Sequence, residues 1–287
     1  MIITQKFNKI SKKIIFSLKN KEIKSIISRD RLKFNYLDVV NYVQIIFAHS
    51  LNQKSFKYFY KKSKFIISYQ GFMKNILLFS KLFKFIFYEI NKTLSIKASN
   101  LLNIVDTTLI SEKQPKFITK KDWNSGRVTT RINKDNNKNH ICWSKGLVFI
   151  NRFGQIYSAN LLPINFSDQN ILKDFSFYLK ELKGILLADR GFTNKSIRER
   201  LSSFRNSIFQ TNKPICRLIS PYQYKQNLTL TNKEKKLYKK RWKIEILFQN
   251  LKHNYSNNKL NLTGKYNFNL KIAKFYSTLI CFNFSTR

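Results

Sequence analysis

Residues 238–252 read Tyr-Lys-Lys-Arg-Trp-Lys-Ile-Glu-Ile-Leu-Phe-Gln-Asn-Leu-Lys. Apolar side chains recur in this stretch every three or four positions, which predicts an amphipathic helix. We expect the helix to run from Thr231 to Asn254, because Thr231 and Glu234 have the spacing of an N-terminal capping box. An apolar stripe on this helix is predicted to pack on a sheet and consists of Ile244, Leu247, Phe248 and Leu251.

Four polar residues lie beside this apolar stripe. At about 100° per residue they fall within an arc of about 60°, and they are Tyr238, Arg241, Glu245 and Lys252. One interpretation is an ordinary surface helix in which Arg241 and Glu245 form an ion pair at i and i+4. The other is a functional site, in which the helix holds one acid beside a hydroxyl group and two cations.

Acidic residues are scarce, at 15 of 287, so their positions are informative. Asp106 lies inside the apolar run 103–110, and Asp189 ends the apolar run 185–189. A carboxylate in a buried strand is costly unless it is paired or binds a metal. Either aspartate alone is compatible with a structural role, capping a turn or pairing with an arginine. Two of them on separate strands of one sheet favour a shared site.

The four polar residues of the helix match, in type and spacing, the Tyr-(2)-Arg-(3)-Glu-(6)-Lys signature of bacterial insertion-sequence transposases of the DDE type, where the numbers count the residues between. In this stretch the chain therefore resembles that family. In that family the glutamate completes an Asp-Asp-Glu triad. The segments Asp106–Thr108 and Asp189–Phe192 resemble the surroundings of the two aspartates. The resemblance covers about residues 100–255. It implies an α/β fold, a ribonuclease H-like mixed five-stranded sheet flanked by helices, with a small N-terminal helical region.

The resemblance also implies a function. The protein would cut the ends of an insertion sequence and join them to target DNA by phosphoryl transfer at two Mg²⁺ or Mn²⁺ ions. Its partners would be the terminal inverted repeats and the target DNA, bound by a homodimer. The residues implied as catalytic and metal-binding are Asp106, Asp189 and Glu245, and those implied as contacts to DNA phosphates are Tyr238, Arg241 and Lys252.

The rest of the chain predicts two domains. Residues 1–95 show helical periodicity among lysines and are expected to form a basic helical region that binds the DNA ends. Residues 96–287 are expected to form the catalytic domain, closed by a C-terminal helix. Its predicted strands are 101–110, 141–151, 155–164, 185–188 and one near 207–210, with a hairpin turn at 152–154. Its other predicted helices are 168–183, 194–202 and 268–284, and 116–138 is predicted to be a loop.

The charge of the chain favours an anionic partner. There are 54 lysines and arginines against 15 acidic residues, a formal net charge of +39. So large an excess favours nucleic acid or an anionic membrane surface as the partner. Part of the lysine excess is also explained by coding in AT-rich DNA. Three scattered cysteines, with no Cys-x-x-Cys pair, argue against a disulfide framework and a zinc site. A metal would therefore be held by carboxylates.

No segment predicts secretion or membrane insertion. The N-terminus lacks an uninterrupted apolar core, and the most apolar stretch, 76–90, is short and interrupted by Lys81 and Lys84. We therefore expect a cytoplasmic bacterial protein that acts on the nucleoid. Three alternatives remain open. They are a ribonuclease H-like nuclease without strand transfer, a transposase remnant that binds DNA without cutting it, and, more distantly, a membrane-surface protein.

Overall fold

A computed structural model gives the arrangement of most of the chain. The residues it describes are 36–52, 55–63, 66–111, 128–132, 138–163, 168, 182, 184–192, 216–220, 230–254 and 267–285. The chain divides into two compact units, one built from the N-terminal region and the last helix, the other from the residues between them. The predicted helix 194–202 and the predicted strand 207–210 lie outside the described residues, as does most of the predicted helix 168–183.

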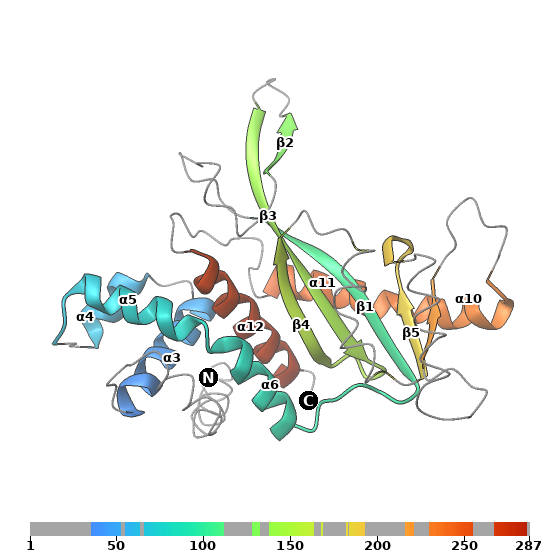
Figure 1. The fold of residues 1–287 in the computed structure, drawn as a ribbon, viewed down its shortest axis with the longest axis horizontal. Coiled ribbons are helices and arrows are strands. Elements are labelled where there is room, and N and C mark those ends of the chain that lie inside the picture. The colour runs from blue at the N-terminus through green and yellow to red at the C-terminus, as the bar shows by residue number, and fades with distance from the viewer. Residues whose placement is uncertain are drawn as a thin grey trace, which may run out of the picture. The chain divides into compact units, whose positions relative to one another are not determined.

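The first unit is helical, as predicted for the N-terminal region. Helix α12 packs against α3, α5 and α6, and the ring centroids of Tyr276 and Phe87 lie 5.4 Å apart. Asn283 donates a buried hydrogen bond of 3.0 Å to Asn91. No helix in the described ranges is long and apolar enough to cross a membrane. The helices are α3 (Tyr36–Asn52), α4 (Phe56–Lys62), α5 (Tyr69–Ser80), α6 (Phe83–Thr93) and α12 (Asn267–Ser285) (Figure 1).

The position of α12 differs from the expectation that it would close the second domain. Residues 273–283 of this helix are all buried, so it has no single apolar face. A helix that is buried on all sides must be enclosed by several neighbours, and α3, α5 and α6 pack against this one. Sequence periodicity predicted that the helix exists, but it carried no information about which unit would bury it.

The described residues of the second unit form a mixed sheet of six strands. Strand β3 pairs antiparallel with β1 and β4, while β1, β5 and β6 are parallel. The central order β4-β3-β1-β5-β6 confirms the predicted ribonuclease H-like sheet (Figure 1). The strands are β1 (Leu102–Ser111), β2 (Val128–Ile132), β3 (Lys138–Asn151), β4 (Ile156–Pro163), β5 (Gly184–Ala188) and β6 (Cys216–Ile219).

The sixth strand corrects the prediction of a loop over 116–138. Strand β2 lies within that stretch and pairs with the first five residues of β3, from Lys138 to Cys142. Four of its five residues, Val128, Thr129, Thr130 and Ile132, are β-branched and suit an extended strand. The polar residues around them obscured this short signal. The strand lengthens the sheet at one end of β3 and leaves the central order unchanged.

The predicted hairpin between β3 and β4 is confirmed. The side-chain oxygen of Asn151 accepts hydrogen bonds from the backbone N–H groups of Phe153 (3.0 Å) and Gln155 (3.1 Å). Gly154 takes a positive φ of 84°, a conformation that glycine adopts without steric cost. This turn sets the register in which Ser144 to Ile150 pair with β4.

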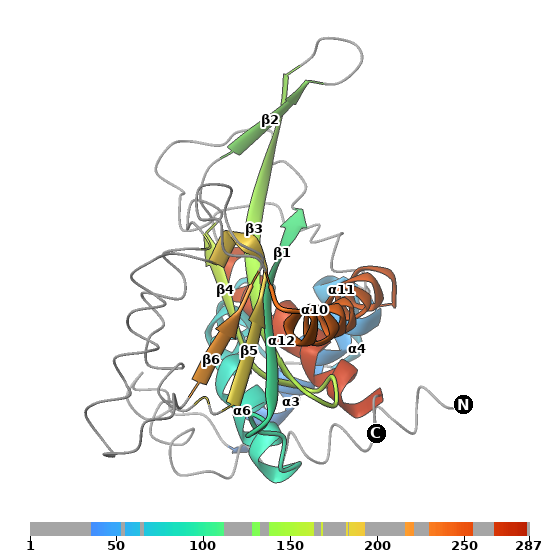
Figure 2. The same ribbon diagram turned by 90° about the vertical axis from the view of Figure 1, so that its right-hand side faces the viewer.

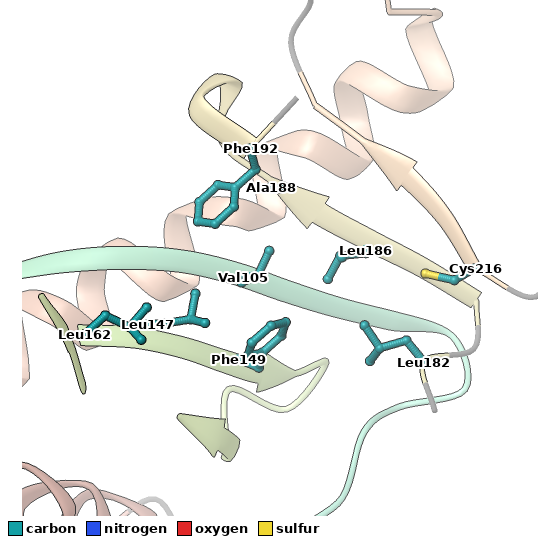
Figure 3. Close-up of a cluster of buried hydrophobic side chains, with 9 residues drawn as sticks. All are labelled: Val105, Leu147, Phe149, Leu162, Leu182, Leu186, Ala188, Phe192 and Cys216. Atoms are coloured by element: carbon teal, nitrogen blue, oxygen red, sulfur yellow. The ribbon is translucent and has the colours of Figure 1, made fainter. Parts of the chain in front are cut away.

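The two faces of the sheet bury different side chains. Alternation along each strand places one set on one face, and this set forms an apolar cluster with Leu182 and Phe192 (Figure 3). The opposite set lies on the side of the sheet where α11 runs (Figure 2). Its apolar members Ile104, Val148, Ile150 and Leu187 are fully buried. Asp106 and Asp189 belong to this second set by the same alternation.

Candidate active site

The strand register brings the two predicted aspartates together. Strands β1 and β5 are parallel, and Val105 pairs with Ala188. The next residue on each strand is an aspartate, Asp106 on one and Asp189 on the other. Neighbouring positions of parallel strands project to the same face at a spacing of about 4.8 Å. Two residues that are 83 positions apart in the chain therefore lie side by side on the face along which α11 runs.

The third predicted acid comes from the predicted helix, which is interrupted. It consists of α10 (Asn232–Tyr238), a 3₁₀ turn η2 (Lys239–Arg241) and α11 (Trp242–Asn254). The predicted capping box is present, since Thr231 accepts from the N–H of Glu234 and the Glu234 carboxylate accepts from the N–H of Thr231. The prediction of one continuous α-helix was wrong. In a 3₁₀ turn residues i and i+3 eclipse, so the turn favours alignment of Tyr238 with Arg241.

The predicted apolar stripe is buried, and it orients the polar stripe. Ile244 and Leu247 are at most 2% exposed, and Phe248 and Leu251 are also buried. With that face packed, Arg241 and Glu245 lie at the edge of the core. Lys252 lies one turn beyond Phe248 on α11, and its side chain is outside the described part of the structure. Its predicted contact with phosphate remains a prediction.

Arg241 joins the three predicted acids. Its Nη2 contacts a carboxylate oxygen of Asp106 at hydrogen-bond distance and lies 3.9 Å from Asp189 Oδ2. Its Nη1 donates to Glu245 Oε1 at 2.6 Å. One guanidinium from η2 is thus surrounded by carboxylates from β1, from the end of β5 and from α11. The Nε–H of Arg241 is buried and has no hydrogen-bond partner within the described ranges.

The four side chains differ in their exposure to solvent. The side chains of Asp106 and Arg241 are 11% and 15% exposed, whereas those of Asp189 and Glu245 are 49% and 55% exposed. The site therefore has a buried half and an open half. Asp189 and Glu245 are open to a substrate, whereas Asp106 and Arg241 are largely covered.

Burial perturbs the protonation of the inner groups. Desolvation raises the pKa of Asp106 to about 6, although Arg241 and the N–H of Thr107 favour its charged form. Burial lowers the pKa of Arg241, but the surrounding acids outweigh this effect and raise it overall. Burial and the nearby acids raise the pKa of Tyr238 against the opposing effect of Arg241. The phenol of Tyr238 is therefore a hydrogen-bond donor at neutral pH.

A fourth acid, Asp168, lies beside both aspartate segments. Its Oδ1 accepts from Thr107 Oγ1 at 3.2 Å and from Lys145 Nζ at 2.9 Å. A Cβ added at Gly191 would lie 3.0 Å from Asp168 Oδ2. Thr107 follows Asp106, and Gly191 lies two residues after Asp189, so Asp168 lies against the segments of two of the three predicted metal ligands. The sequence placed Asp168 at the start of the predicted helix 168–183, and nothing in its spacing indicated this contact.

The donor set suits a hard divalent cation. Three carboxylates supply oxygen ligands, which Mg²⁺ and Mn²⁺ prefer. The guanidinium of Arg241 brings one positive charge to these three acids. Among the described residues, however, no three His, Cys, Asp or Glu side chains are grouped closely enough to hold one ion. The guanidinium lies between the carboxylates. The ligand atoms are therefore of the right type for a divalent metal ion, but in this structure they are too far apart to share one.

Comparison with known proteins places the described geometry in context. A family model for a transposase DDE domain matches residues 98–277, a range that contains all four acids of the site. No curated protein matches the sequence. Among solved structures, the synaptic complex of piggyBac transposase with hairpin DNA aligns with a TM-score of 0.47 and 8% identity, covering 88% of this chain and 66% of the piggyBac chain. The chain thus spans just under two thirds of the length of that transposase.

Proposed function

Because this chain belongs to the family of DDE transposase domains, we propose that it cuts the ends of a bacterial insertion sequence and joins them to target DNA by metal-dependent phosphoryl transfer. The single observation that carries the proposal is the convergence of Asp106, Asp189 and Glu245 on one guanidinium. The three acids come from separate elements and lie within the range matched by the family model.

We assign the metal-binding role to these three carboxylates. Asp106 and Asp189 would hold ions from adjacent strands, and Glu245 would complete the site from α11. Two bound Mg²⁺ or Mn²⁺ ions would activate the attacking oxygen and stabilise the leaving oxygen. The buried position of Asp106 fits the inner ligand, and the exposure of Asp189 and Glu245 fits ligands that meet the DNA.

The polar stripe supplies groups that would bind phosphates beside the reacting bond. Tyr238 would donate its phenolic hydrogen to a phosphate oxygen, Arg241 would grip one with two donors, and Lys252 would act as a point charge. In the first step a water oxygen bonds to phosphorus and the bond to the 3′ oxygen breaks, leaving a 3′-hydroxyl. In the second step that hydroxyl attacks a phosphodiester of the target, whose own 3′ oxygen leaves.

The proposal includes partners and location. The helices of residues 1–95 would bind the terminal repeats, and two copies of the chain would hold the two ends together. The net charge of +39 supports binding to DNA, with an affinity that falls steeply with salt. Action on a bacterial nucleoid follows from the resemblance to insertion-sequence transposases.

The test compares aspartate-to-asparagine variants on DNA that carries the element's own ends. Asp189→Asn and Asp106→Asn should reduce strand cleavage by about a thousandfold or more while DNA binding in Ca²⁺ is retained. Glu234→Gln makes the same change at the start of α10, where a glutamine can keep the capping hydrogen bond, and should cleave normally. Normal cleavage by Asp189→Asn would remove this residue from the mechanism.

The same assay separates the competing functions. Cleavage without joining of the ends to target DNA would favour a ribonuclease H-like nuclease. Binding of DNA without cleavage in Mg²⁺ or Mn²⁺ would favour a transposase remnant. Products that contain the element's end covalently joined to target DNA would support the transposase.

A further inference from the structure

We propose that Arg241 is an exchangeable counter-cation, which closes the carboxylate site of the metal-free protein and which divalent ions must displace. This inference rests on the proposed metal-binding role of Asp106, Asp189 and Glu245. It adds that Arg241 competes with the metal ions for the three carboxylates. Once the ions displace it, Arg241 becomes available to bind a phosphate of the DNA.

The contacts of the guanidinium show the competition directly. The Nη2 atom contacts an oxygen of Asp106 and lies 3.9 Å from Asp189, and Nη1 donates to Glu245 at 2.6 Å. Mg²⁺ binds carboxylate oxygens at about 2.0–2.1 Å. An ion at that distance from the same oxygen of Asp106, on the side that faces Arg241, would overlap the space of Nη2. The guanidinium and an ion therefore cannot share this position, and one must leave when the other binds.

The bound position of Arg241 is also incomplete. Its buried Nε–H has no hydrogen-bond partner within the described ranges, and an unsatisfied buried donor is unfavourable. Arg241 also brings a single positive charge to the three carboxylates. A divalent ion compensates more of that charge, and a displaced arginine can satisfy its donors elsewhere. Both effects favour exchange over permanent closure.

The displaced side chain has a nearby anionic destination in the proposed reaction. Arg241 ends the η2 turn, so its side chain can rotate while α11 stays packed through Ile244 and Leu247. A phosphate of bound DNA offers acceptors in a geometry that suits a guanidinium. Metal binding would thereby release a phosphate-binding group. Ions and DNA would bind with positive coupling, which is reciprocal by thermodynamic necessity.

The test measures Mn²⁺ binding to the full-length protein without DNA, by electron paramagnetic resonance of the free ion. Arg241→Met removes the competitor, and we expect Mn²⁺ to bind about tenfold more tightly or better, equivalent to about 1.4 kcal/mol. The matched control is Lys240→Met, which removes the same charge from the adjacent, exposed residue. It should change the affinity by less than about twofold, because solvent screens it.

Two further measurements keep the inference testable if Arg241→Met does not fold. Arg241→Lys retains the charge but not the forked pair of donors, and it should also bind Mn²⁺ more tightly than the wild type. In the wild type, titration with diamagnetic Mg²⁺ should shift the Nε–H NMR signal of Arg241, identified by its absence from the Arg241→Lys spectrum. A signal that does not move while Mg²⁺ binds would overturn the inference.

The outcomes distinguish this inference from the proposed function. Unchanged or weaker Mn²⁺ binding by Arg241→Met, in a protein whose wild type binds Mn²⁺ and cleaves DNA, would refute the exchange and leave the transposase proposal intact. If wild type and Asp189→Asn bind Mn²⁺ equally poorly and neither cleaves DNA, the carboxylate site itself is not a metal site. That result would refute both proposals.

Discussion

Asp106 on β1 and Asp189 at the end of β5 lie side by side, because the parallel register that pairs Val105 with Ala188 continues into these two residues. Arg241, 135 positions after Asp106, reaches both of them from the turn between two helices. With Glu245, these residues place four charged side chains together on the sheet, and two of them, Asp106 and Arg241, are largely buried.

The burial of Asp106 should give the metal-free protein an unusual pH dependence. Its pKa is raised from 3.8 to about 6, so between these values the folded state binds more protons than the unfolded state. The free energy of unfolding should therefore fall as pH rises from about 4 to about 6, by up to about 3 kcal/mol, and this contribution should stay constant above that range.

The measurement is urea unfolding in EDTA at several pH values, for wild type and Asp106→Asn. Other acids also titrate in this range, so the difference between the two proteins isolates Asp106. The variant should lack the decline and gain stability relative to wild type as pH rises. If the free energies of unfolding of the two proteins change with pH in parallel, the pKa of Asp106 is the same in the folded and the unfolded state.

Gly184 should tolerate no side chain. It has a φ of +77°, and a Cβ there would lie 2.3 Å from the backbone oxygen of Asn100 and 2.7 Å from that of Leu101. Those backbone atoms cannot move aside easily, because Ile185 donates a hydrogen bond of 3.0 Å to Leu101. We expect Gly184→Ala to lower the free energy of unfolding by about 3 kcal/mol or more.

Gly154 provides the matched control. It also has a positive φ, of +84°, but a Cβ there would meet nothing within 4 Å. Gly154→Ala should therefore lower the free energy of unfolding only by the cost of placing an alanine in this left-handed backbone conformation, about 1–2 kcal/mol. The difference between the two variants in chemical denaturation measures the steric part alone. Equal losses would mean that the start of β5 can shift away from Asn100.

Asp168 should act as a positioning residue. Its carboxylate accepts hydrogen bonds from Thr107 and Lys145 and packs against Gly191. Asp168→Ala should lower stability by about 1–2 kcal/mol, because Lys145 is only 12% exposed and loses an acceptor. It should also slow DNA cleavage by about tenfold or more, since small displacements of reacting groups are costly.

Asp168→Asn is the control for this role, since the amide oxygen can still accept from Thr107. It should retain most of the stability and more of the cleavage rate than Asp168→Ala, at unchanged Mn²⁺ affinity. If both variants cleave as fast as wild type, the contacts of Asp168 with Thr107 and Gly191 do not position Asp106 or Asp189.

The phenol of Tyr238 should contribute to DNA binding. Burial raises its pKa, so it is protonated at neutral pH and can donate to a phosphate oxygen. A hydrogen bond to a charged group contributes about 1.5–3 kcal/mol, so Tyr238→Phe should weaken DNA binding by about tenfold or more. Fluorescence anisotropy at fixed salt would measure this. Tyr157→Phe, which removes a phenolic hydroxyl from β4 on the other face of the sheet, is the control and should bind normally.

Local sequence patterns predicted the elements that carry the site. The apolar run around Asp106, the turn at Gly154 and the capping box at Thr231 are each specified within about ten residues, and each is present in the structure. The alignment of Arg241 with Glu245 also follows from helical spacing alone. These features are predictable because backbone hydrogen bonding and side-chain alternation act over short distances in the chain.

Contacts between distant segments were decided only by the tertiary structure. Sequence placed Asp168 near a helix start, but the fold brings it to Thr107, 61 positions earlier. Sequence placed α12 in the second domain, but the fold buries it among the N-terminal helices. The resemblance assigned Arg241 to phosphates, whereas its guanidinium here contacts three carboxylates. Periodicity specifies which face of an element is buried, but only strand register and packing determine what that face meets.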